Sequence, residues 1–105
     1  MNNYISQNTT DYHANLIQSL HDKNEATAYL EVALEEYEDD GDSQAFMLAL
    51  KNVVEAQGGI GHLSKKTGLD RAHLYRVLSS KGNPRFITLG NILKALGFKL
   101  SVNAL

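Results

Sequence analysis

A single glycine, Gly68, separates two short segments of helical apolar spacing, and this pattern constrains the fold more than any other feature of the chain. Leu63 anchors the first segment, residues 61–67, in a core. In the second segment, residues 71–79, three apolar residues share one side of a helical wheel: Leu74, Val77 and Leu78. Gly68 supplies a left-handed backbone conformation that a residue with a Cβ adopts only at a cost. The pattern therefore predicts two helices joined by a tight turn.

The second of these helices has two different faces. Asp70 precedes it, can cap its first turn, and places a negative charge at the positive helix end. Small Ser64 permits close approach of the two helices. On a wheel of 100° per residue, the arc opposite the apolar residues is contiguous: Arg71, Ala72, Tyr75, Arg76 and Ser79. One face is thus expected to pack, and the other is free to contact DNA.

Helical spacing covers most of the remaining chain, so the predicted fold class is all-α. We expect the first ten residues to form a loose, polar tail. The other expected helices run from Asp11, from Glu25 to the acidic stretch 38–42, from Ser43 as cap to Gln57, and from Leu89 to Leu96 behind Thr88 as cap.

The residues after the last helix alternate instead. Phe98, Leu100 and Val102 are separated by polar residues, which is strand periodicity. A lone strand cannot satisfy its own backbone groups, so we expect it to pair with a second chain or to lie along a groove. The predicted organisation is an acidic N-terminal helical arm, residues 1–41, and a helix-turn-helix DNA-binding domain with a C-terminal dimerisation strand, residues 42–105.

Charge divides the chain in two. Residues 1–57 contain eleven carboxylates against two lysines, a net charge of −9. Residues 58–105 contain eight Lys and Arg residues against one acid, a net charge of +7. Such asymmetry suggests that the basic half meets a polyanion and the acidic half a cationic partner or solvent. Double-stranded DNA is the favoured partner. The competing hypothesis is a protein-interaction module whose helical hairpin is structural and whose basic half docks an acidic protein.

In a DNA complex, phosphates and bases would be contacted by different side chains. We expect the phosphate contacts from Lys65, Lys66, Ser79 and Lys81. Arg71 and Arg76 are expected to contact bases, with Tyr75 or Ala72 in apolar contact.

Several other function classes find little support. The chain has no Cys, which excludes disulfides and thiolate metal sites. Its four His residues include no pair at helical i, i+4 spacing with a third, carboxylate ligand, and no nucleophile constellation or P-loop is present. We therefore expect no enzyme, cofactor or metal site. The first residues lack a basic start and an apolar run, so neither a signal peptide nor a membrane span is expected, and the predicted location is cytoplasmic.

A series of short motifs adds to this interpretation: Ala28-Tyr29-Leu30-Glu31, Ala33-Leu34-Glu35-Glu36, Phe46-Met47-Leu48-Ala49-Leu50, Leu63-Ser64-Lys65-Lys66-Thr67-Gly68-Leu69, Leu74-Tyr75-Arg76-Val77-Leu78, Gly82-Asn83-Pro84, Thr88-Leu89 and Lys94-Ala95-Leu96-Gly97. Through them the chain, from about Asp22 to Val102, resembles the addiction-module antidote family, small bacterial helix-turn-helix proteins related in fold to the phage repressor and Cro group. It departs from the family pattern at two positions. Gly61 stands where a Ser or Thr cap is expected, and Ser64 where Ala is usual.

The resemblance implies a phage-repressor-like fold and a homodimeric, DNA-binding antitoxin. Such a protein neutralises a small basic toxin of the RelE/ParE type and represses its own operon by binding the operator. The resemblance places the recognition-helix roles on Arg71, Ala72, Tyr75 and Arg76. An alternative within the same class is a stand-alone transcriptional regulator without a toxin.

Overall fold

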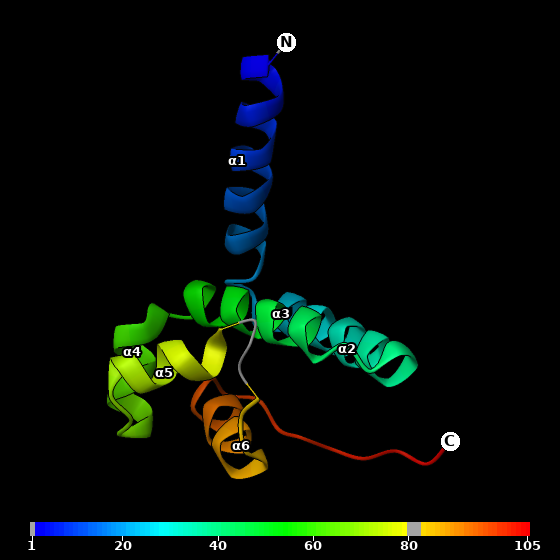
Figure 1. Cartoon of the computed structure of the whole chain (residues 1–105), viewed down its shortest axis with the longest axis vertical. Helices are drawn as coiled ribbons and strands as arrows, with labels where there is room; N and C mark the ends of the chain where they lie inside the picture. Colours follow the sequence, from blue (N-terminus) through cyan, green and yellow to red (C-terminus); the bar gives the residue numbers. More distant parts are fainter. Residues whose placement is uncertain (1, 80–82) are drawn as a thin grey trace.

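A computed structural model describes the backbone of residues 2–79 and 83–105, with side chains from Asp11 onward. Within these ranges the chain forms six helices and no strand: α1 (Asn2–Ser19), α2 (Lys23–Asp40), α3 (Ser43–Ala56), α4 (Gly59–Thr67), α5 (Arg71–Leu78) and α6 (Phe86–Ala95). Figure 1 shows α2 and α3 side by side, with α4, α5 and α6 grouped at one end of α3. The predicted all-α class is confirmed.

Helix α1 begins at Asn2, so the expectation of a loose tail up to Asp11 was wrong. It extends away from the other helices (Figure 1) and contacts α3 at its C-terminal end. The side-chain amide of Gln57 donates to the Leu20 carbonyl at 2.7 Å, and His13 Nε2 lies 3.2 Å from a Glu55 carboxylate oxygen. The end of α1 is therefore attached to the end of α3, while Leu20 is buried in the core.

Helices α2 and α3 form an antiparallel hairpin with a cap at each end. The Asp22 carboxylate accepts from the backbone N–H groups of Asn24 at 2.8 Å and Glu25 at 3.1 Å. Gly41, at φ +72°, ends α2 in the left-handed conformation. The cap of α3 is Asp42, which accepts from the Gln44 N–H at 3.0 Å, rather than the predicted Ser43. The acidic stretch is thus used for helix termini, and α2 continues to Asp40.

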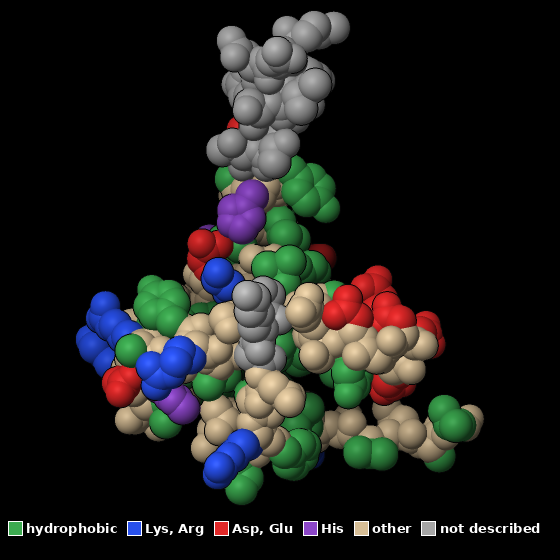
Figure 2. All heavy atoms as spheres, viewed as in Figure 1, with side chains coloured by type: hydrophobic (Ala, Val, Ile, Leu, Met, Phe, Trp, Pro, Cys, Tyr) green, Lys and Arg blue, Asp and Glu red, His purple; other side chains and the backbone are tan. Residues whose placement is uncertain are grey.

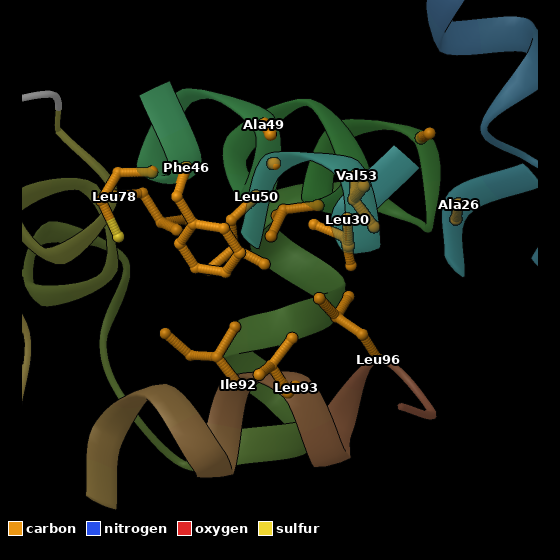
Figure 3. Packing of buried hydrophobic residues seen from close by; sticks show 14 of the residues in the cluster. Ala26, Leu30, Phe46, Ala49, Leu50, Val53, Leu78, Ile92, Leu93 and Leu96 are labelled. Atoms are coloured by element: carbon orange, nitrogen blue, oxygen red, sulfur yellow. The ribbon is translucent and has the colours of Figure 1, made fainter. Parts of the chain in front are cut away.

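One apolar core joins all six helices. Figure 3 shows Phe46, Leu50 and Leu30 facing Ile92 and Leu93 of α6. The residues predicted to point inward from α3 are all buried: Phe46, Ala49, Leu50, Val53 and Val54. Ala26, Leu30 and Ala33 of α2 are buried in the same cluster. Burial of these side chains supplies most of the driving force that orders the short helices, which would be marginal in isolation.

Helix α6 begins at Phe86, three residues before the predicted start at Leu89, so Thr88 lies inside the helix and is not its cap. Its C-terminus closes through Gly97, at φ +89°. The Gly97 N–H donates to the Lys94 carbonyl at 2.9 Å and the Phe98 N–H to the Leu93 carbonyl at 2.8 Å, which is a Schellman motif.

The predicted C-terminal strand was wrong: residues 98–102 form no strand in this chain. A strand needs a neighbour to receive its backbone hydrogen bonds, and none of the described segments provides one. The Phe98 N–H is used to end α6, and its ring packs against the core. Lys23 Nζ lies 5.0 Å from the centre of this ring and donates to the Leu96 carbonyl, which connects the start of α2 to the end of α6. Leu100 and Val102 remain exposed.

None of the helices in the described part of the chain combines the length and apolar character needed to cross a membrane.

Candidate nucleic-acid interface

The turn between α4 and α5 is held by hydrogen bonds from small polar side chains. Gly68 adopts φ +77°, as predicted, and its N–H donates to the Ser64 carbonyl at 2.9 Å. The Ser64 hydroxyl donates to the Leu69 carbonyl at 2.6 Å. The Thr67 hydroxyl accepts from the Leu69 N–H at 3.2 Å and donates to the Leu63 carbonyl at 2.9 Å. Ser64 therefore does more than permit close approach, because its hydroxyl satisfies a carbonyl of the turn.

Asp70 caps α5, as predicted. Its carboxylate accepts from the His73 N–H at 2.7 Å, and its backbone is extended, so α5 starts cleanly at Arg71. The cap and the Gly68 turn together set the direction in which α5 leaves α4.

The wheel assigned to α5 is confirmed by burial. Leu74 and Leu78 are 0% and 2% exposed, and Val77 is half-buried against the core. The residues of the opposite arc are all exposed: Arg71, Ala72, Tyr75, Arg76 and Ser79. One face of α5 anchors the helix, and the other presents two guanidinium groups and a phenol ring to solvent.

The remaining predicted contacts lie close to this arc in the sequence. Lys65 and Lys66 are exposed in the last turn of α4, where a positive charge also suits the helix dipole. Ser79 is the C-cap of α5, and its hydroxyl donates to the Arg76 carbonyl at 2.9 Å. This bond uses its only proton, so in the free protein Ser79 has only acceptor capacity left. Lys81 lies outside the described residues.

Gly61 is a functional candidate that the sequence analysis missed. A Cβ built on Gly61 would lie 2.9 Å from Nη2 of Arg71 and 3.3 Å from its Cζ, so the Arg71 guanidinium lies directly over this glycine. Its φ is not in the positive region, so backbone conformation does not require glycine here. The signal in the sequence was the departure from the expected Ser or Thr: the absent side chain leaves room for the arginine.

The two charge classes are concentrated in different parts of the molecule. Figure 2 shows Lys and Arg side chains at the end where α4 and α5 lie and Asp and Glu side chains gathered at the far end of α2. The charge asymmetry of the sequence is therefore also an asymmetry in space, and the exposed arc of α5 lies in the basic region. A positive surface of this kind attracts the phosphates of nucleic acid.

Comparison with known proteins identifies a family. A family model described as "Probable addiction module antidote protein" matches residues 10–104. An uncharacterized protein of Haemophilus influenzae (strain ATCC 51907 / DSM 11121 / KW20 / Rd) is 27% identical over 73 residues, which cover 70% of this chain and 74% of the relative. No solved structure matches the chain closely enough to count as a relative. Because the family match spans nearly the entire sequence, the chain belongs to the family of probable addiction module antidote proteins.

Proposed function

We propose that this protein is the DNA-binding antitoxin of a toxin-antitoxin module, and that it represses its own operon by occupying the operator. The observation that carries the proposal is the division of α5 into a buried face, Leu74 and Leu78, and an exposed face with Arg71, Tyr75 and Arg76. A helix anchored on one side and basic on the other can enter a major groove, which is wide enough to admit an α-helix. The α4–turn–α5 segment then acts as the helix-turn-helix of a phage-repressor-like domain.

In this mechanism Arg71 and Arg76 donate hydrogen bonds to base edges, and Tyr75 or Ala72 makes the apolar contacts. Lys65 and Lys66 hold phosphates and set the register on the duplex, with Lys81 as a further phosphate contact. Ser79 contacts a phosphate by turning its hydroxyl proton from the Arg76 carbonyl to the phosphate oxygen, which can only accept. Repression is steric, because a protein seated on the promoter excludes the polymerase. No chemical step is required, and the protein acts in the cytoplasm, where the operator lies.

The active species in this proposal is a homodimer. Phe86 and Ile87, adjacent in the first turn of α6, are 76% and 75% exposed, and so large an apolar pair is costly to leave in water. Pairing of two chains through this turn would bury both residues, and a dimer that binds two half-sites one helical turn apart needs its two copies of α5 about 34 Å apart. Ile87→Asp should therefore give monomers in sedimentation velocity and weaken operator binding. A wild-type chain that sediments as a monomer at micromolar concentration contradicts this part of the proposal.

The second activity is neutralisation of a small basic protein toxin of the RelE/ParE type. Family membership supports an antidote role, and the net charge of −9 on residues 1–57 suits a cationic partner. Expression of the adjacent small reading frame with and without this chain tests it: growth should stop without the chain and resume with it. If growth does not resume, the neutralising activity is wrong and the protein is a stand-alone regulator.

DNA binding is tested on the protein's own promoter by fluorescence anisotropy over a series of salt concentrations. Arg71→Ala should weaken specific binding by ~1–3 kcal/mol, with little effect on random DNA. Lys65→Ala should weaken both DNAs alike and reduce the slope of log K against log salt by about one. If wild-type protein binds promoter and random DNA equally, sequence-specific repression is wrong. If it binds neither, the helical hairpin is structural and the interaction-module hypothesis replaces it.

A further inference from the structure

We infer that the toxin docks on one exposed face of the α2–α3 hairpin, made by Tyr29 and Val32 of α2 and by Leu48 and Asn52 of α3. We call these four residues the hairpin face. The inference rests on the proposed antitoxin function and assigns its protein-binding surface.

The hairpin face is held together by a hydrogen bond between the two helices. The Asn52 side-chain amide donates to the Tyr29 hydroxyl at 3.1 Å, and both side chains are half-buried. Val32 follows Tyr29 by three residues, and Leu48 precedes Asn52 by four. Because α2 and α3 are antiparallel and residues three or four apart are neighbours on a helix surface, Val32 and Leu48 are both displaced from this bond toward the loop at residues 41 and 42. The bond orients the two helices and so fixes the spacing of the two apolar side chains.

Both apolar side chains of the hairpin face are exposed. Val32 is 53% exposed and Leu48 is 55% exposed, although each belongs to a helix whose opposite side is buried in the core. Apolar residues grouped on a rigid surface and surrounded by polar ones are typical of a protein-binding site. The hairpin face has this composition, since acidic residues border it.

The border determines which partner fits. Glu25 precedes Tyr29 by four residues, Glu36 follows Val32 by four, and both are exposed on the same side of α2. Lys51, three residues after Leu48, is the one cation between residues 24 and 57, and Lys23 is engaged with the Leu96 carbonyl. The occupant is therefore a positively charged protein segment with apolar side chains. Symmetric pairing of two hairpin faces is disfavoured, because it would bring like charges together.

The acidic residues of α2 gather at the opposite end of the molecule from the cations of α4 and α5 (Figure 2). Toxin docking and DNA contact are thus assigned to different surfaces. Substitutions in the hairpin face are expected to separate the two activities, which gives the experiment an internal control.

The experiment uses full-length protein and the purified product of the adjacent reading frame, with the affinity measured by titration calorimetry. Val32→Arg and Leu48→Arg each replace an apolar contact by a charge of the partner's sign, and each should weaken binding about tenfold or more. Thr27→Arg is the matched control: it adds the same charge to the same helix at an exposed β-branched residue, about 140° away from Val32 on the wheel. Binding by this variant should stay within about twofold of wild type.

Thermal unfolding and promoter binding are measured on the same samples, and both should be unchanged in all three variants. If Thr27→Arg weakens toxin binding as much as the hairpin-face variants, only bulk charge matters and the inference is wrong. If all three variants bind like wild type, the toxin docks elsewhere while the antitoxin function stands. If wild-type protein neither binds the adjacent product nor rescues growth, the proposed antitoxin function itself has failed.

Discussion

Substitution of Gly61 by Ala should affect folding and DNA binding in opposite directions. Gly61 lies inside α4 with an ordinary helical backbone, so Ala removes the entropic cost of glycine and should raise the free energy of unfolding by up to ~1 kcal/mol. The new methyl would meet Arg71 Nη2 at 2.9 Å, which is closer than such atoms approach. Only the end of a flexible side chain has to move, so the folded domain tolerates the change easily.

The displaced guanidinium loses the support that restricts its rotamers. Ordering a long side chain on binding costs ~0.5–1.5 kcal/mol, so operator affinity should fall about two- to tenfold. This loss should disappear when Arg71 is already absent. We therefore expect Gly61→Ala to weaken promoter binding in the wild-type background and to have no effect in the Arg71→Ala background.

The assay is a double-mutant cycle on promoter DNA at one fixed salt concentration, with chemical denaturation of each variant as the stability measurement. An equal loss of affinity in both backgrounds would show that Gly61 acts through the helix and not through Arg71, which refutes the reasoning. A drop in the free energy of unfolding would refute the claim that only the tip of Arg71 obstructs the methyl.

Three further substitutions test the packing and the caps by chemical denaturation. Leu74→Ala removes a fully buried side chain from α5 and should lower the free energy of unfolding by ~2–5 kcal/mol. A loss below about 1 kcal/mol would place Leu74 outside the core. Asp70→Ala removes the hydrogen bond that caps the His73 N–H and should lower the free energy of unfolding by ~0.5–2 kcal/mol. An unchanged free energy of unfolding would show that this cap does not stabilise α5. Lys23→Met keeps a side chain of similar length but loses the hydrogen bond to the Leu96 carbonyl and the contact with the Phe98 ring. The free energy of unfolding should fall by ~1–2 kcal/mol. An unchanged denaturation midpoint would show that Lys23 does not connect α2 to the end of α6.

The features that the sequence predicted correctly depend on interactions between residues that are close together in the sequence. The buried side of α5 follows from a period of 3.6 residues, the turn at Gly68 from the missing Cβ, and the cap at Asp70 from a carboxylate within reach of the next turn's N–H groups. The inward residues of α3 were predicted in the same way. In each case the controlling interaction spans fewer than about five residues, so the local pattern contains it.

The candidate site was predictable to the same extent. The exposed arc with Arg71 and Tyr75 follows from periodicity, because burial of one side of a helix leaves the other side in solvent. The position of the Arg71 guanidinium over Gly61 was not predictable, since those residues belong to different helices and meet only when α5 folds back on α4. The hairpin face is hidden in the sequence for the same reason: the Tyr29–Asn52 bond joins residues 23 apart.

Only the tertiary structure determined the conformation of the residues that follow α6. Alternating residues after Gly97 are compatible with a strand, but alternation does not supply a partner for backbone hydrogen bonds. The folded chain uses the Phe98 N–H to close α6 and sets the Phe98 ring beneath Lys23, which lies far away in the sequence. The start of α6 at Phe86 is likewise not set by a side-chain cap, because Arg85 makes no capping bond. Sequence period thus determined which face of each helix is buried, whereas contacts between distant segments determined how the chain leaves the last helix.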